Sequence, residues 1–120
     1  MEMTLAHEQL DVWRLAMQLV IGIYKLTEPF PSHEQFGLTA QLRRAAVSVP
    51  LNIAEGKGRY HRKEFIQFLY NARGSLYEVL TLLKLARELG YLDQGAHQKM
   101  LEMSKRVLSK LSGLINALKA

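Results

Sequence analysis

Two neighbouring segments of this chain carry polar residues at the same helical spacing, with a short glycine-containing break between them. The residues are Gln41, Arg44, Ser48, Asn52 and Glu55 in the first segment, and Glu64, Gln67, Asn71, Ser75 and Glu78 in the second. Steps of three and four residues place each set on one face of an α-helix. If the chain folds back at residues 56–59, the two sets face each other in order, with Glu55 beside Glu64 and Ser48 beside Asn71. The pattern therefore predicts an antiparallel helical hairpin.

Apolar residues recur at helical spacing along most of the 120 residues, and 48% of the chain is apolar. Breaks at 29–32, 56–60 and 90–92 divide it into four predicted helices. These run from residue 8 or 10 to 28, from Ser32 to the glycines at 56 and 58, from about 61 to 89, and from about 94 to 118. Because short connections make consecutive helices antiparallel, the sequence predicts an all-α fold: an antiparallel up-down-up-down four-helix bundle, in one domain spanning residues 1–120.

Several residues predict where the helices begin, end and bend. Ser32 and Gln35 fit a capping box at the start of the second helix. Gly90 suits the position just after the third helix, and Asp93 can cap the fourth. Pro50 lies inside the second helix, where proline removes a backbone hydrogen bond at a cost of roughly 3 kcal/mol. We therefore expect the second helix to be kinked at Pro50.

The first predicted helix is apolar around most of its circumference, and its polar residues form one narrow stripe. A helix at a protein surface normally keeps a broad polar half, and every helix of a four-helix bundle has a solvent side. We therefore expect another subunit to cover part of this helix. The predicted contact residues are Val12, Leu15, Leu19 and Ile23.

Ordered motifs along the chain resemble a known family. They are Leu10-Asp-Val-Trp13, Gln41-Leu-Arg-Arg-Ala45, Ser48-Val-Pro-Leu-Asn-Ile-Ala-Glu-Gly56, Ala72-Arg-Gly-Ser75 and Leu89-Gly-Tyr-Leu92. Over roughly residues 10–115 the chain resembles the four-helix-bundle proteins encoded within 23S rRNA intervening sequences of bacteria. Where that family usually has a serine before the third helix, this chain has Tyr60-His61-Arg62, which weakens the helix cap and adds charge.

The resemblance implies a homopentameric ring with no enzymatic activity and no cofactor. The family is also similar to an accessory protein of diversity-generating retroelements, a basic pentamer that works with a reverse transcriptase and nucleic acid. The resemblance therefore implies that the partner is a nucleic acid or a protein such as a reverse transcriptase.

Positive charge is concentrated around the predicted turn between the second and third helices. The formal net charge is +5, and residues 57–63 contain no acid. Basic side chains at such a turn can contact phosphates, and a ring would repeat the contact in every subunit. The candidate nucleic-acid-binding residues are Arg43, Lys57, Arg59, Arg62 and Lys63. Tyr60 is the only aromatic residue of the turn, so the sequence does not predict base stacking. The alternative is a solvated basic turn.

The matched polar stripe has two interpretations. It is either the solvated side of the hairpin or a structural seam in which polar groups of the two helices pair. Its middle residues are small or carry amides, and it contains no lysine, which favours the seam. We expect Arg44 or Arg43 to reach Glu78, and Asn52 to bond across the hairpin.

The sequence offers no signature of catalysis, metal binding or membrane insertion. It lacks cysteine, a phosphate-binding glycine loop, a nucleophile elbow and a Glu-x-x-His pair. We also expect neither a secretory signal nor a membrane span, because residues 1–4 lack a basic region followed by an apolar core and no apolar run is long enough to cross a bilayer. We expect a cytoplasmic protein that is not an enzyme. Two hypotheses remain: a ring-forming accessory factor that binds RNA or DNA, and a protein-interaction scaffold with no role in nucleic-acid binding.

Overall fold

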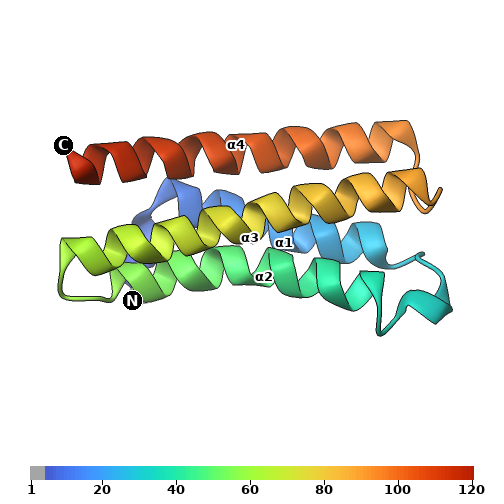
Figure 1. Ribbon diagram of the computed structural model, residues 1–120, viewed down its shortest axis with the longest axis horizontal. Helices are drawn as coiled ribbons and strands as arrows, with labels where there is room; N and C mark the ends of the chain where they lie inside the picture. Colours follow the sequence, from blue (N-terminus) through green and yellow to red (C-terminus); the bar gives the residue numbers. More distant parts are fainter. Residues whose placement is uncertain (1–4) are drawn as a thin grey trace, which may run out of the picture.

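The computed structural model describes residues 5–120, and four long helices make up most of it. They are α1 (Asp11–Thr27), α2 (Leu38–Lys57), α3 (Arg62–Glu88) and α4 (Gln94–Lys119). Short 3₁₀ helices, η1 (Ala6–Gln9) and η2 (Ser32–Glu34), precede α1 and α2. Consecutive long helices run in opposite directions along the longest axis (Figure 1). The predicted antiparallel four-helix bundle is therefore confirmed.

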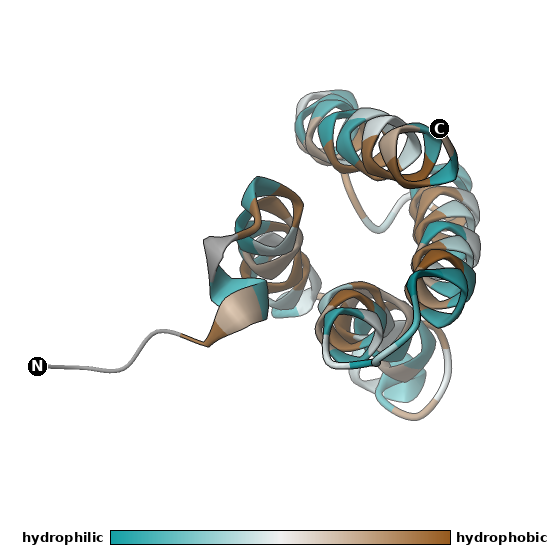
Figure 2. Ribbon diagram, turned by 90° about the vertical axis from the view of Figure 1, so that its left-hand side faces the viewer, coloured by the Kyte–Doolittle hydropathy of each residue, from teal (hydrophilic) through white to brown (hydrophobic). Residues whose placement is uncertain are grey.

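The four helices surround one apolar core, and their hydrophobic sides turn toward it (Figure 2). Each helix contributes side chains that are fully or almost fully buried, spaced by three, four or seven residues. The largest are Leu19 and Ile23 from α1, Leu42 and Ile53 from α2, Leu69, Leu76 and Leu83 from α3, and Leu111 and Ile115 from α4. The periodicity seen in the sequence is thus the periodicity of the core.

The ends of α3 and α4 follow the local signals in the sequence. Gly90 has a φ of +78°, a backbone conformation that favours glycine. The amide of Tyr91 donates to the Ala86 carbonyl at 2.9 Å, and the amide of Gly90 donates to Arg87 at 3.1 Å. These two bonds form the Schellman motif that closes a helix. The Asp93 carboxylate accepts the Ala96 amide at 2.7 Å, so the predicted cap of α4 is confirmed.

The start of α2 differs from the prediction. Ser32 lies in η2, no side-chain cap forms at that turn, and α2 begins only at Leu38. The capping group is instead Glu34, whose Oε1 accepts the Leu38 amide at 3.1 Å while its Oε2 accepts the Tyr91 hydroxyl at 2.9 Å. Both bonds lower the pKa of Glu34 below its usual value, and the bond from the Leu38 amide has the larger effect. A carboxylate displaces the expected serine cap because charged acceptors bind helix N-terminal amides more strongly.

The middle of α2 contains Pro50, which is buried, and the helix continues past it to Lys57. No bond joins the Ser48 hydroxyl to a carbonyl that the proline leaves free, because that hydroxyl pairs with Ser75 instead. The kink at Pro50 stays a prediction.

The predicted subunit contacts of α1 prove to lie inside the subunit. Val12 is 4% exposed, Leu19 and Ile23 are 0% exposed, and Leu15 is half-buried. The assignment of Val12, Leu19 and Ile23 to an interface is therefore wrong, because the bundle's own core already covers them. The exposed apolar side chains of α1 are Met17, Ile21 and Tyr24.

Candidate nucleic-acid interface

The turn between α2 and α3 brings four of the five predicted nucleic-acid-binding residues to one end of the bundle. Lys57 closes α2, Arg59 lies in the turn, and Arg62 and Lys63 open α3. All four side chains are exposed to solvent. The C-terminal end of α4 lies at the same end of the molecule (Figure 1). We call this surface, made of Lys57, Arg59, Arg62 and Lys63, the basic tip.

The geometry of the basic tip depends on the close approach of α2 and α3. Gly56 is buried in the last turn of α2. A Cβ atom at this position would lie 2.6 Å from the Cβ of Phe68 and 3.0 Å from the Cδ1 of Phe65. Glycine therefore lets the end of α2 rest directly on the two phenylalanines of α3.

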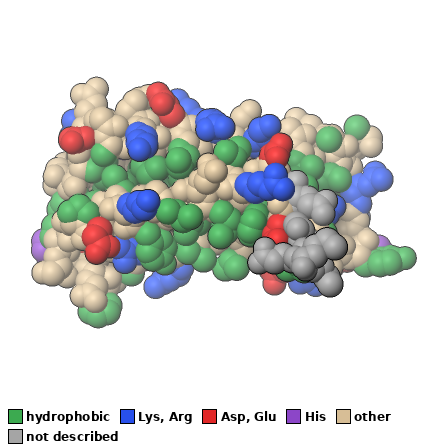
Figure 3. Space-filling view, turned by 180° about the vertical axis from the view of Figure 1, so that it is seen from behind, with side chains coloured by type: hydrophobic (Ala, Val, Ile, Leu, Met, Phe, Trp, Pro, Cys, Tyr) green, Lys and Arg blue, Asp and Glu red, His purple; other side chains and the backbone are tan. Residues whose placement is uncertain are grey.

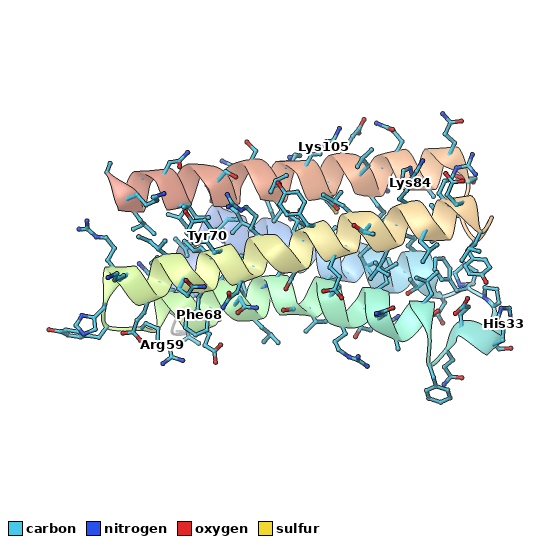
Figure 4. All side chains as sticks on the ribbon, viewed as in Figure 1. His33, Arg59, Phe68, Tyr70, Lys84 and Lys105 are labelled. Atoms are coloured by element: carbon cyan, nitrogen blue, oxygen red, sulfur yellow. The ribbon has the colours of Figure 1, made fainter. Side chains whose placement is uncertain are left out.

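These two rings also hold basic side chains. The Nζ of Lys57 lies 5.6 Å from the centre of the Phe65 ring, and the Arg59 guanidinium lies 4.7 Å from the centre of the Phe68 ring. Figure 4 shows Arg59 and Phe68 close to the turn. An aromatic face attracts a cation without neutralising it. Within residues 5–120 the tip residues make one ion pair, between Arg59 and Glu64 at 4.0 Å, and exposed pairs of this kind are weak. The tip thus keeps a net positive charge.

The first turn of α3 adds to the positive electrostatic potential at the basic tip. His61 is the N-cap residue, and its side chain makes no capping hydrogen bond. The first amides of α3, with the positive end of the helix dipole, therefore point toward the same surface as the basic side chains.

A second group of basic residues, which sequence reasoning missed, lies beside the tip on α3 and α4. The Nζ of Lys119 donates to the Tyr70 hydroxyl at 3.2 Å, and the Arg73 guanidinium lies 4.8 Å from the centre of the Tyr70 ring. Tyr70 lies between α3 and α4 in Figure 4. Tyr70 and Arg73 lie three residues apart on one helix, and this spacing could have indicated their contact. The approach of Lys119 from α4 could not be inferred from the sequence. The cluster extends the basic surface from the turn along α3.

Arg43 does not join the basic tip. It lies fourteen residues before Lys57 in the same helix, which corresponds to about 21 Å along the axis. Its Nε donates to the Thr27 hydroxyl at 2.8 Å, its Nη2 donates to the Tyr24 carbonyl at 3.3 Å, and its guanidinium lies 4.6 Å from the centre of the Tyr24 ring. Glu28 adds an ion pair at 3.8 Å. Arg43 thus joins α2 to the end of α1.

The polar stripe forms a seam only in its middle. The hydroxyls of Ser48 and Ser75 bond across the hairpin at 2.8 Å. The Nδ2 of Asn52 donates to the Ser48 carbonyl at 2.8 Å and to its hydroxyl at 3.0 Å. Asn52 therefore bonds within α2 and not across the hairpin, contrary to expectation. Ser48 faces Ser75 instead of Asn71, so the predicted register was off by one helical turn.

The outer members of the stripe are exposed to water. They are Gln41, Arg44, Glu55, Glu64, Gln67, Asn71 and Glu78. Gln67 donates to Asn71 at 3.3 Å within α3. No ion pair within 4.0 Å joins Arg43 or Arg44 to Glu78 in the described part of the chain. The seam interpretation thus holds for Ser48 and Ser75, with Asn52 bonded to Ser48 from within α2, and the solvated interpretation holds for the ends of the stripe.

A separate apolar face runs along the groove between α1 and α2. A hollow of about 370 Å³ is lined mainly by apolar side chains, including Trp13, Met17 and Leu51. A wider hollow of about 740 Å³ continues from it along α2, sharing Val47 and Leu51 and extending to Tyr24. Hydrophobic side chains gather along the middle of the face that carries α1 (Figure 3). We call this surface the α1–α2 face.

The described residues contain neither a cluster suited to a metal ion nor a helix suited to spanning a membrane. Between residues 5 and 120, no three His, Asp or Glu side chains group so as to hold a metal ion. No helix in that range combines the length and the apolar character needed to cross a bilayer.

Residues 8–113 match the 23S rRNA-intervening sequence protein family. The chain belongs to this family. The match covers most of the chain and confirms the resemblance that its motifs predicted. No curated protein matches the chain closely enough to count as a relative.

A solved structure shows the same fold for another protein of this kind. It is a protein of the S23 ribosomal protein family from Bacteroides thetaiotaomicron, described as having unknown function. It is 21% identical to this 23S rRNA-intervening sequence family member, with a TM-score of 0.82 over 88% of this chain and 95% of that chain. At such low identity the likeness shows a shared fold.

Proposed function

We propose that this protein is a non-enzymatic, ring-forming bundle that binds RNA or DNA through the phosphates, without recognising base sequence. The observation that carries the proposal is the basic tip: four exposed cations from the end of α2, the turn and the start of α3, of which, within the described residues, Arg59 alone forms an ion pair, a weak one with Glu64. Phosphate contacts need this concentration of exposed, unneutralised charge. The neighbouring Lys119 and the free amides of α3 support the same assignment.

The α1–α2 face supports the oligomeric part of the proposal. Its exposed apolar residues, Met17, Tyr24 and Leu51, lie on adjacent helices, and Leu51 is 62% exposed. Contiguous apolar surface marks an interaction site more often than scattered single residues do. We assign it to a second copy of the chain, in keeping with the homopentamer that the family resemblance implies. A ring of this kind would present several basic tips to one polynucleotide, and linked weak contacts bind far more tightly than one.

A charge-reversal experiment tests the nucleic-acid assignment. The double variant Arg62→Glu/Lys63→Glu should abolish binding to RNA in a filter assay. The control Lys99→Glu/Lys105→Glu changes the net charge equally on exposed positions of α4 and should bind nearly as wild type. Wild-type affinity should also fall with salt, with a slope of about −2 on logarithmic axes if three phosphates of a single strand are contacted in each subunit. Equal binding by both double variants would refute the assignment.

Light scattering tests the assembly. Met17→Lys and Leu51→Lys place a charge on the α1–α2 face at positions that are 37% and 62% exposed, so each should fold and yet lower the measured mass toward one subunit. A wild-type protein that is monomeric at micromolar concentration would refute the ring.

The second candidate function is a protein-interaction scaffold, and the same α1–α2 face favours it. A partner protein would then occupy that apolar surface, and the positive charge would only steer encounter. A salt slope near zero, with wild-type protein monomeric, is the result expected from the scaffold.

A further inference from the structure

Tyr60 is the most exposed large apolar side chain of those described. It is 93% exposed, in the turn between α2 and α3. The ring of His61 meets it edge-on, with centres 4.9 Å apart and planes at 90°. This single edge contact, together with the high exposure, leaves a broad face of the Tyr60 ring open to solvent.

The surroundings of this ring distinguish it from Tyr77, an exposed aromatic residue of α3. Tyr60 lies inside the basic tip, next in sequence to Arg59 and between Lys57 and Arg62. Tyr77 is also exposed, at 54%, but it lies fourteen residues beyond Lys63 on α3, or about 21 Å along the helix. An aromatic platform flanked by cations is the arrangement with which proteins bind unpaired nucleotides: the cations hold the backbone and the ring stacks on a base.

We infer that Tyr60 stacks on an unpaired base, so that the basic tip binds single-stranded or looped nucleic acid more tightly than a duplex. The inference rests on the proposed phosphate contacts. A base inside a duplex is already covered on both faces, so it offers no surface to the tyrosine. The ring recognises a π-face and not a hydrogen-bonding pattern, so stacking adds affinity for single strands without adding sequence specificity.

The test compares Tyr60 variants on two probes: a fluorescently labelled oligouridine strand and an RNA duplex of similar length, at one salt concentration. Tyr60→Leu should lose roughly 5- to 150-fold in affinity for the single strand, as expected for one stacked base. Tyr60→Phe should retain most of the affinity, and duplex binding should be unchanged in both variants. The control Tyr77→Leu should behave as wild type on both probes. Because stacking on a base involves no phosphate contact, Tyr60→Leu should also leave the salt slope unchanged.

The outcomes separate this inference from the function on which it rests. If Tyr60→Leu binds the single strand as wild type does while Arg62→Glu/Lys63→Glu abolishes binding, the stacking inference is wrong and the phosphate contacts stand. If Tyr60→Leu weakens duplex and single strand equally, the preference for unpaired bases is wrong. If neither variant changes binding, the basic tip is not the nucleic-acid site. Thermal unfolding of each variant confirms that it is folded, as expected for changes in an exposed turn.

Discussion

Gly56 gives the sharpest test of how α2 and α3 pack. In Gly56→Ala, the new methyl group would lie 2.6 Å from the Cβ of Phe68, 3.0 Å from the Cδ1 of Phe65 and 3.3 Å from the Phe65 carbonyl oxygen. The first and third of these atoms are fixed to the backbone of α3 and cannot move away by rotating a side chain. The two helices must therefore separate at this end of the bundle.

Two opposing contributions determine the size of the effect. Replacing a glycine inside a helix with alanine stabilises the helix by about 1 kcal/mol. Overpacking a filled core costs about 1 to 3 kcal/mol, and contact with rigid atoms favours the upper part of that range. We therefore expect Gly56→Ala to lower the free energy of unfolding by about 1 to 2 kcal/mol.

Two other glycines supply matched controls. Gly74 in α3 and Gly113 in α4 are exposed, and a Cβ atom at either position would meet nothing within 4 Å. Alanine at these positions keeps the helix contribution without the clash, so each variant should gain about 0.5 to 1 kcal/mol. The same chemical change is thus expected to have opposite signs at buried and exposed sites.

Unfolding in urea followed by circular dichroism measures all three variants at one protein concentration, because oligomer formation would make the result depend on concentration. Thermal midpoints should move by roughly 3 to 6 °C per kcal/mol for a chain of this size. A Gly56→Ala variant as stable as Gly74→Ala would show that α2 and α3 do not approach as closely as described.

Three further predictions concern the interior and the helix caps. The double-mutant cycle of Ser48→Ala and Ser75→Ala should give a coupling energy of about 0.5 to 1.5 kcal/mol in urea unfolding, and a coupling of zero would contradict the hydroxyl pair. Leu76→Ala removes a fully buried side chain and should cost about 2 to 5 kcal/mol, whereas a loss below 1 kcal/mol would contradict its place in the core. Glu34→Gln should destabilise the protein near neutral pH. Because folding lowers the pKa of Glu34, the stability it provides is present above the carboxyl's usual pKa and is lost as pH falls through the lowered value. The difference between wild type and Glu34→Gln should therefore shrink in acid, and a difference independent of pH would contradict the cap.

Local signals allowed the ends of α3 and α4 to be predicted to within a residue. Gly90 and Asp93 act through bonds to neighbours fewer than six residues away, so a short stretch of sequence contains all that is needed. The start of α2 depends on Glu34, and Glu34 is also bonded to Tyr91, which lies 57 residues further along the chain. The sequence around Ser32 contains no sign of that distant hydroxyl, so the capping box was the natural but wrong prediction.

The hairpin shows the same limit at the level of register. Matched spacing correctly predicted that α2 and α3 pair, since both polar sets lie on a face of a helix. It could not fix their relative shift, because Gly56 rests on Phe65 and Phe68 and this contact sets how far the helices slide. The result is Ser48 beside Ser75, one turn from the expected partner.

Which side of α1 faces the core could not be predicted from the sequence, for a different reason. A helix that is apolar on most sides has several stripes that could face the core, and periodicity alone does not choose between them. Packing against α2 and α4 buries Val12, Leu19 and Ile23. The apolar surface that the bundle leaves uncovered on α1 is therefore formed by Met17, Ile21 and Tyr24. Their side chains remain exposed on the outer side of the helix. Since Tyr24 and Met17 also border the hollows shared with α2, a subunit that covers these two side chains must contact α2 as well, and variants of α2 such as Leu51→Lys become as informative about that contact as variants of α1.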